Sequence, residues 1–219
     1  MNFLNYFINL LEQYNFDGEV IENEHPDSFF SEHQPSHEST KDDDSLYYYT
    51  EDSKTINRNL WKGEKHDMHD KISNVLKSGR PAKKDFHVFT GVNANKNELK
   101  GNLHIPAFTS TSTRVSEAAD FTPVKGSRHT TEKHVNDGVE KEYNIHHIIK
   151  IHVKKGQQVG AYISDFSQFP KEREFLINKG HTLHLSGEHE DHHMPPYREG
   201  LNPRIYRIHH ATITMDDEK

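Results

Sequence analysis

Apolar residues recur at helical spacing in the first third of the chain. Between Phe3 and Tyr14 they form a stripe that predicts a short amphipathic helix over residues 2–15. Its polar face lacks the lysines and arginines that anionic lipids attract, so docking on the domain or on a partner is favoured over a membrane surface. Two further helices are predicted, with faces made of Leu46, Tyr49, Ile56 and Leu60 and of Met68, Ile72, Val75 and Leu76. Gly79 and Pro81 end the second of these.

Beyond Pro81 the pattern changes to the short apolar runs of β-strands. The predicted strands cover residues 86–91, 105–113, 147–153, 159–163, 173–177, 181–185 and 204–215. One helix, over residues 114–121, interrupts them. Helices first and mainly antiparallel strands afterwards predict the α+β class.

The composition predicts one folded domain with a lean core. Hydrophobic residues make up 32% of the 219 and the mean hydropathy is -0.97, so part of the chain is not expected to pack. The segment from Glu22 to Ser45 is acidic, rich in histidine and nearly free of aliphatic side chains, which is typical of a flexible linker. We therefore expect residues 1–45 to form a helix and a linker, and residues 46–219 to form the main domain.

The charge balance restricts the partners. Asp and Glu number 34 against 27 Lys and Arg, and the net charge of -7 argues against a protein that binds nucleic acid through general basicity. No apolar run approaches the ~20 residues that span a bilayer, and the N-terminus lacks the positive region of a secretory signal. A soluble protein without a membrane partner is predicted. The absence of cysteine excludes disulfides and thiolate chemistry.

The 19 histidines raise the question of a metal site, most clearly at residues 189–193. The stretch has no recognised ligand spacing on a helix, and the following Met194-Pro195-Pro196 indicates a loop. We expect adventitious metal affinity there and no catalytic metal.

Two carboxylates and a run of hydroxyls are the candidate chemistry. Glu172 and Glu174 flank Arg173 in a predicted strand, so alternation would place both acids on one face. Residues 109–113 form a second strand made only of Ser and Thr. One carboxylate could stabilise positive charge on a sugar carbon, while the other orients and deprotonates a nucleophile. By spacing alone, the pair is equally compatible with a solvated strand face.

The order of several motifs resembles a known family. Phe108-Thr109-Ser110-Thr111-Ser112, the helix with Ala118 and Ala119, the strand 148–153 and Glu172-Arg173-Glu174-Phe175-Leu176-Ile177 are similar to mono-ADP-ribosyltransferases of the R-S-E class. Residues 104–108 and 154–163 look most like the Alt-like enzymes of tailed bacteriophages. Upstream, Tyr49-Thr50 followed by Ile56-Asn57 and Leu60 is similar to the helical entry of that domain, so the resemblance runs from about residue 46 to the C-terminus. It implies an ADP-ribosyltransferase fold of two packed, mainly antiparallel sheets with N-terminal flanking helices.

The resemblance also implies roles for individual residues. Glu174 matches the catalytic acid that contacts the nicotinamide ribose of NAD, and Glu172 matches the acid that goes with arginine as acceptor. Ser110 matches the serine that supports the cofactor and the catalytic acid, and Thr111 and Ser112 complete that motif.

Two further regions have a match in the family, one of them with a departure. Residues 164–171 match the substrate-recognition loop, which makes Phe166 and Phe169 candidates either for contact with the acceptor or for plugging the loop into the core. Gly91 matches a glycine beside the nicotinamide, but the arginine that precedes it in the family is Thr90 here. A threonine has neither the charge nor the reach to hold phosphates. The cations considered as substitutes are Arg114, Arg80 and His87.

The implied activity is transfer of ADP-ribose from NAD to an exposed arginine of a protein. The alternatives are an NAD glycohydrolase, which uses water as acceptor, and a catalytically degenerate binding protein, for which Thr90 is the argument. The phage resemblance makes host RNA polymerase and translation proteins candidate targets. It also suggests delivery into the host cytoplasm in a virion.

Overall fold

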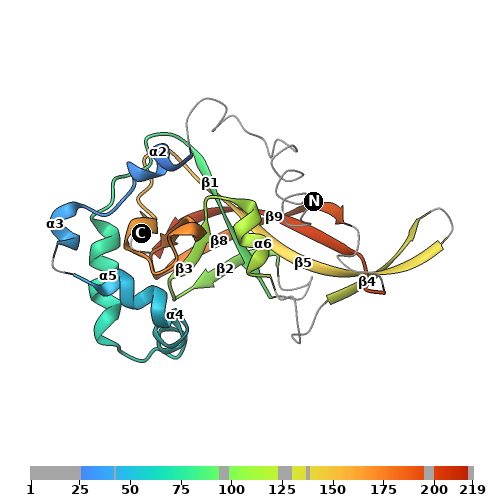
Figure 1. Cartoon of the computed structure of the whole chain (residues 1–219), viewed down its shortest axis with the longest axis horizontal. Helices are drawn as coiled ribbons and strands as arrows, with labels where there is room; N and C mark the ends of the chain where they lie inside the picture. Colours follow the sequence, from blue (N-terminus) through green and yellow to red (C-terminus); the bar gives the residue numbers. More distant parts are fainter. Residues whose placement is uncertain are drawn as a thin grey trace.

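The computed structural model describes residues 26–41, 43–93, 99–122, 130–136, 139–194 and 200–216. Its helices are α2 (Pro26–Ser31), α3 (His37–Thr40), α4 (Ser45–Trp61), α5 (Asp67–Lys77) and α6 (Val115–Asp120). The helices α3, α4 and α5 gather at one end of the molecule, and the β4–β5 hairpin reaches out at the other (Figure 1). Within the described ranges, no helix has the length and apolar character needed to cross a membrane.

The described strands are hydrogen-bonded in one continuous path, so no break separates the two sheets that were expected. They are β1 (Phe86–Val92), β2 (Gly101–Ile105), β3 (Thr109–Ser112), β4 (Thr130–Asn136), β5 (Val139–Val153), β6 (Gly160–Tyr162), β7 (Glu174–Ile177), β8 (His181–Met194) and β9 (Arg204–Met215). Their order is β2-β8-β9-β5-β1-β3-β7-β6, and β4 pairs with β5. The β5–β9 pair is parallel, whereas the other described pairs are antiparallel. The α+β class is confirmed.

Both faces of the sheet are covered, which explains how a lean composition can build a core. One face carries a buried cluster that runs from β7 through β1, β5 and β9 to β8, and α2 packs on it. On the other face, α6 packs against apolar residues of β1, β5 and β9. The α4–α5 pair covers β6 and β7. The strand β7 is therefore buried along its whole length.

The two helices predicted from apolar stripes are confirmed as α4 and α5. Leu46, Tyr49 and Ile56 of α4 are buried, as are Ile72, Val75 and Leu76 of α5. These side chains share one cluster with Ala161, Ile163 and Leu176 of the sheet. Because this cluster fixes α4, the side of α4 that faces β3 and β7 has a defined position, as the contact of Tyr49 with Ser110 shows.

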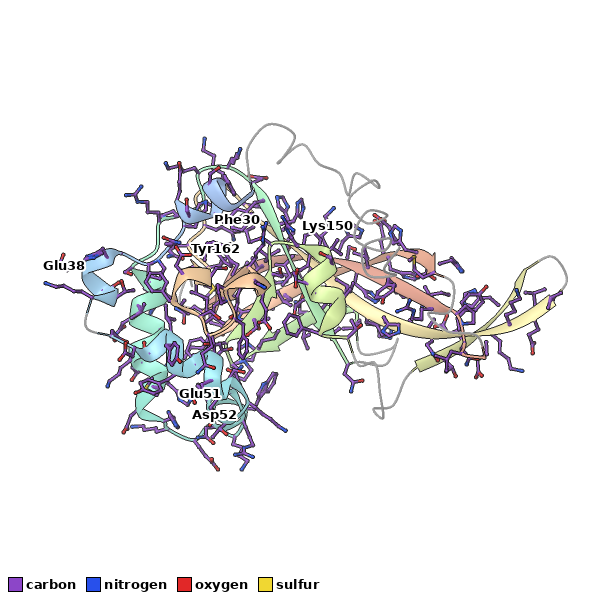
Figure 2. All side chains as sticks on the ribbon, in the orientation of Figure 1. Phe30, Glu38, Glu51, Asp52, Lys150 and Tyr162 are labelled. Atoms are coloured by element: carbon purple, nitrogen blue, oxygen red, sulfur yellow. The ribbon has the colours of Figure 1, made fainter. Side chains whose placement is uncertain are left out.

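The prediction of a flexible linker is wrong for residues 26–41, which are folded and packed. Phe29 and Phe30 of α2 are buried in the main core, where Phe30 meets Phe86 edge to face at 5.4 Å. Phe30 also lies beside Tyr162 of β6, with ring centroids 5.8 Å apart (Figure 2). Aromatic burial here replaces the aliphatic residues whose scarcity suggested a linker. The predicted helix 2–15 lies outside the described residues.

Two strand predictions are corrected. The predicted strand 105–113 is two strands, since the chain leaves β2 before Pro106 and re-enters the sheet as β3, beside different partners. The predicted loop 189–193 belongs to β8, where His189 pairs with His209 of β9. Strand β4 and the first half of β5 were not predicted, because their sequence alternates charged and polar residues with few apolar ones.

Candidate active site

A cavity of about 300 Å³ opens where α4, β3 and the segment before β7 meet. It is lined by Tyr49, Thr50, Ser53, Ser110, Thr111, Phe121, Phe169, Glu172 and Glu174. The structure thus brings the two predicted acids and the predicted serine to one place. These residues come from four separate parts of the chain. The antiparallel pairing of β3 with β7 brings Ser110 and Thr111 beside Glu174, whose direct partner in the register is Ser112.

The two acids meet by a geometry that differs from the prediction. Glu172 ends the 3-10 turn η2 (Pro170–Glu172), and only Glu174 lies in the strand. Between them Arg173 has φ 49° and ψ 47°, the left-handed conformation that costs a non-glycine residue about 1 kcal/mol. Strand alternation is therefore the wrong reason for their common orientation. The left-handed residue turns the chain so that both carboxylates line the same cavity.

Hydroxyls of β3 hold this turn in place. Ser112 Oγ donates to the carbonyl of Glu172 at 2.9 Å and accepts the N–H of Arg114 at 3.1 Å. Thr111 Oγ1 donates to the carbonyl of Phe175 at 2.5 Å. The side chains of Thr111 and Ser112 thus bond to the backbone that carries the acids, and we assign them a positioning role.

Burial dominates the electrostatics of the two acids. Glu174 is 6% exposed, and burial raises its pKa to about 7, although a hydrogen bond from Ser110 lowers the pKa and the charge of Glu172 raises it. Burial also raises the pKa of Glu172, and the charge of Glu117 adds to this effect. No lysine or arginine is found among the described residues that line the cavity. Glu174 is thus an acid that titrates near neutrality, beside a hydroxyl and a second acid.

The loop before the acids contains two phenylalanines with different environments. Phe166 is partly buried and packs against the cluster under α4 and α5, which supports the core alternative for this residue. Phe169 is 49% exposed and lines the cavity. Gln168 donates its backbone N–H to Thr50 Oγ1 at 3.1 Å, so the loop is attached to α4 beside Phe169.

Four predicted cofactor contacts do not line this cavity: Thr90, Gly91, Ser112 and Arg114. An added Cβ at Gly91 would lie 2.4 Å from the carbonyl oxygen of Ala118, so close approach of α6 accounts for the glycine. Thr90 pairs with Ile149 inside the sheet. Arg114 precedes α6 and lines a neighbouring cavity of about 500 Å³. As cofactor contacts, these four residues stay predictions.

The other proposed substitute cations are also placed elsewhere. Arg80 and His87 are absent from the described lining, and His87 stacks on His152 with ring centroids 5.0 Å apart. The neighbouring cavity does hold cations, since Lys171 and Arg173 line it beside Arg114. These cations therefore line a different cavity from the one that the two acids line.

Sequence reasoning missed four residues of the lining: Tyr49, Thr50, Ser53 and Phe121. Tyr49 was assigned to a core face and Phe121 to a helix. Phe121 is 54% exposed, an unusual position for a large aromatic side chain beside a cavity. The Tyr49-Thr50 pair upstream of Asn57 was the available signal, because it was similar to the family's helical entry.

Comparison with known families identifies the family of the chain and its fold. The model of the ADP-ribosyltransferase exoenzyme family matches residues 18–194, which is most of the chain. The chain belongs to the ADP-ribosyltransferase exoenzyme family. The match begins at residue 18 and so includes the segment expected to be a linker, in agreement with the packing of α2. A search of curated protein sequences finds no significant match.

Solved structures show the ADP-ribosyltransferase fold at low sequence identity. Plx2a, an ADP-ribosyltransferase toxin from Paenibacillus larvae, is 18% identical with a TM-score of 0.51, over 85% of this chain and 94% of that one. The C3 exoenzyme of Clostridium limosum is 18% identical with a TM-score of 0.55, over 86% and 91%. C3stau2 from S. aureus, solved with NAD, is 13% identical with a TM-score of 0.53, over 87% and 93%. The predicted ADP-ribosyltransferase fold is confirmed.

Proposed function

We propose that this ADP-ribosyltransferase uses NAD as its ADP-ribose donor and an arginine of a target protein as its acceptor. One observation carries the proposal: Glu172, Glu174 and Ser110 line a single cavity. The donor is further supported by relatives whose structures contain NAD or NADH. The acceptor is supported by Glu172, since a guanidinium group needs a carboxylate to orient it and to take its proton.

The reaction follows from the positions of the acids. The bond between ribose C1 and the nicotinamide nitrogen breaks, and its electron pair leaves with nicotinamide. Ionised Glu174 stabilises the positive charge that develops on the ribose, in a site where burial strengthens the interaction. A guanidinium nitrogen then forms a bond to C1 and gives its proton to Glu172. The products are nicotinamide and an arginine-linked ADP-ribose.

Two exposed aromatic rings suit the two substrates. Phe121 offers a ring face inside the cavity for the planar nicotinamide, and Phe169, on the loop attached to α4, faces outward for the acceptor. The described lining holds no cation for the diphosphate of NAD. Either the cations that line the neighbouring cavity compensate for Thr90, or NAD binds more weakly.

Incubation with labelled NAD and a bacterial lysate tests the proposal. We expect the purified protein to release nicotinamide and to label a lysate protein through arginine, with both reactions lost in Glu174→Gln. Glu172→Gln should retain nicotinamide release but lose arginine labelling by roughly 100-fold. The identity of the labelled lysate protein also tests the proposed acceptors, which are host RNA polymerase and translation proteins of a phage-infected bacterium.

Other outcomes would support the alternatives. Nicotinamide release without any protein label, unaffected by Glu172→Gln, would indicate an NAD glycohydrolase. Partner binding without release of nicotinamide, surviving Glu174→Gln, would indicate a degenerate binding protein, and Thr90 would then explain the loss of activity.

A further inference from the structure

A chain of hydrogen bonds connects the interior of α4 to the candidate catalytic acid. The backbone N–H of Phe108 donates to Asn57 Oδ1 at 3.2 Å. Asn57 Nδ2 donates to the hydroxyl of Tyr49 at 3.1 Å. That hydroxyl lies 3.2 Å from Ser110 Oγ. Ser110 and Glu174 line the same cavity, where the Ser110 hydroxyl acts to lower the pKa of Glu174. Three hydrogen bonds therefore link the Phe108 backbone, just before β3, through Asn57 and Tyr49 of α4 to Ser110 of β3, which lines the same cavity as Glu174 of β7.

The chemistry of the groups fixes the direction of this path. A backbone N–H can only donate, so it must meet the oxygen of the Asn57 amide, and the Asn57 nitrogen must face Tyr49. The Tyr49 oxygen thus accepts one bond, and its own proton is available for Ser110. The single proton of Ser110 is then left for the carboxylate of Glu174. Every donor points toward the acid.

We propose that Tyr49 and Asn57 are positioning residues that direct the Ser110 proton onto Glu174, so that the acid is ionised for the reaction. The proposal rests on the proposed function of Glu174. It assigns control of the ionisation of Glu174 to a path of hydrogen bonds that begins at the Phe108 backbone. Neither Tyr49 nor Asn57 touches the reacting atoms in this scheme. Tyr49, fully buried, holds its hydroxyl at a fixed place beside Ser110.

The surroundings explain why such a path is needed. Glu174 faces Tyr49 from α4 and Glu172 from η2, and Glu117 of α6 acts on Glu172. No described residue of the cavity lining supplies a positive charge to offset these acids. Hydrogen bonds that run in one direction polarise one another, and a low dielectric strengthens them. The aligned donors substitute for a cation.

Tyr49→Phe removes the last donor before Ser110 and keeps the packing ring. Without it, the Ser110 proton is no longer oriented, and ionisation of Glu174 becomes less favourable. We expect the acid limb of the pH profile of kcat/KM for nicotinamide release to move up by about half to one pH unit. Activity should fall several-fold near pH 6.5 and recover within about twofold above pH 8.5.

Asn57→Asp tests the direction of the path with almost no change of shape. An aspartate at this position accepts from both the Phe108 N–H and the Tyr49 hydroxyl, so the Tyr49 proton turns away from Ser110. The acid limb should move up at least as far as in Tyr49→Phe. Part of this shift is the direct effect of the added charge. In the Tyr49→Phe background there is no hydroxyl to reverse, so Asn57→Asp should there give a smaller shift.

A direct titration separates this proposal from the proposed function. In protein labelled with carbon-13 at glutamate side chains, the Glu174 signal is assigned by its absence in Glu174→Gln, and its titration needs no activity. A higher Glu174 pKa in Tyr49→Phe supports the path even if no arginine is labelled. An unchanged pKa in both variants would overturn the path, even if the enzyme is active. Tyr206→Phe is the matched control, since its hydroxyl accepts a 3.2 Å bond from Arg204 outside the site and its loss should not move the titration.

Discussion

Two groups of buried acids stand in contrast. Near the distal hairpin, Arg207 is 2% exposed and bonds bidentately to two carboxylates, with contacts of 2.7 and 3.0 Å to Glu132 and of 2.7 Å twice to Asp191. Burial alone would raise the pKa of Asp191, but the bonds and the charge of Arg207 hold it below its usual range. At the cavity, Glu174 is buried more deeply than these two acids, and the group that lowers its pKa is the Ser110 hydroxyl.

The contrast separates a structural use of buried charge from a chemical one. An acid paired with a cation is satisfied in its ionised form and stabilises the fold. An acid beside a hydroxyl and a second acid is poised between its two forms, which suits a reaction in which a substrate brings the positive charge. Exchanging or removing the partners of each group of acids tests this distinction.

Arg207→Met should produce the largest effect. Without the guanidinium, Glu132 and Asp191 of β4 and β8 remain close together with no cation, and we expect a loss of about 3 kcal/mol in the free energy of unfolding. Urea unfolding at pH 7.5 measures it. The triple variant with Glu132→Gln and Asp191→Asn removes the uncompensated charges and should regain most of the loss. If the triple variant is as unstable as the single one, packing and not charge explains the role of Arg207.

Glu174→Gln should act in the opposite direction. The native pKa of Glu174, about 7, is raised above the unfolded value, so its ionisation reduces stability as the pH rises from about 4.5 toward 7. A neutral glutamine should therefore stabilise the fold by on the order of 2 kcal/mol at pH 8, with no effect at pH 4, where both forms are neutral. Thermal unfolding across this range measures the difference. Equal stability at pH 8 would mean that Glu174 is not strained by its burial.

The sequence predicted the parts of this contrast unequally. The E-x-E acids and Ser110 line one cavity, because β7 is buried along its whole length and pairs with the hydroxyl-rich β3 in a defined register. The left-handed Arg173 could not be predicted, since a non-glycine residue adopts that conformation only under tertiary constraint. The path from Asn57 to Ser110 was equally hidden, because its partners are distant in sequence.

The distal ion cluster was missed for a related reason. Its strands β4 and β8 contain mostly charged and polar residues, so periodicity gives no apolar face to detect. Charged pairs stabilise them, such as Asp191 with its cross-strand partner Arg207, which only the structure brings together. The prediction for residues 26–41 was wrong for a similar reason. Only two phenylalanines, Phe29 and Phe30, pack this otherwise polar segment into the core.

The histidines beside Arg207 offer a smaller test of the structural half. His147 Nδ1 and His209 Nε2 are 2.9 Å apart, and burial lowers the pKa of each to about 4. The charges of Arg207 and His189 add to this effect, and Asp191 opposes it for both histidines. Because the folded pKa lies below the unfolded value near 6.5, stability should fall as the pH drops from 6.5 toward 4. His209→Gln should lessen this fall by about 1 kcal/mol, measured by urea unfolding at stepped pH. His37→Gln, on exposed α3, should leave it unchanged.

The two loop phenylalanines divide structure from chemistry most sharply, and Phe169 has the smallest effect on stability of the residues considered. Phe166→Ala should destabilise the fold by about 2 kcal/mol, because its ring packs under α4. Phe169→Ala should change stability by less than about 0.5 kcal/mol, since the ring is 49% exposed, but should raise the KM for the acceptor protein roughly 10-fold. Nicotinamide release with water as acceptor separates the two substrates. If Phe169→Ala slows that reaction equally, Phe169 contacts NAD, and the acceptor must be recognised by another part of the surface around the two acids.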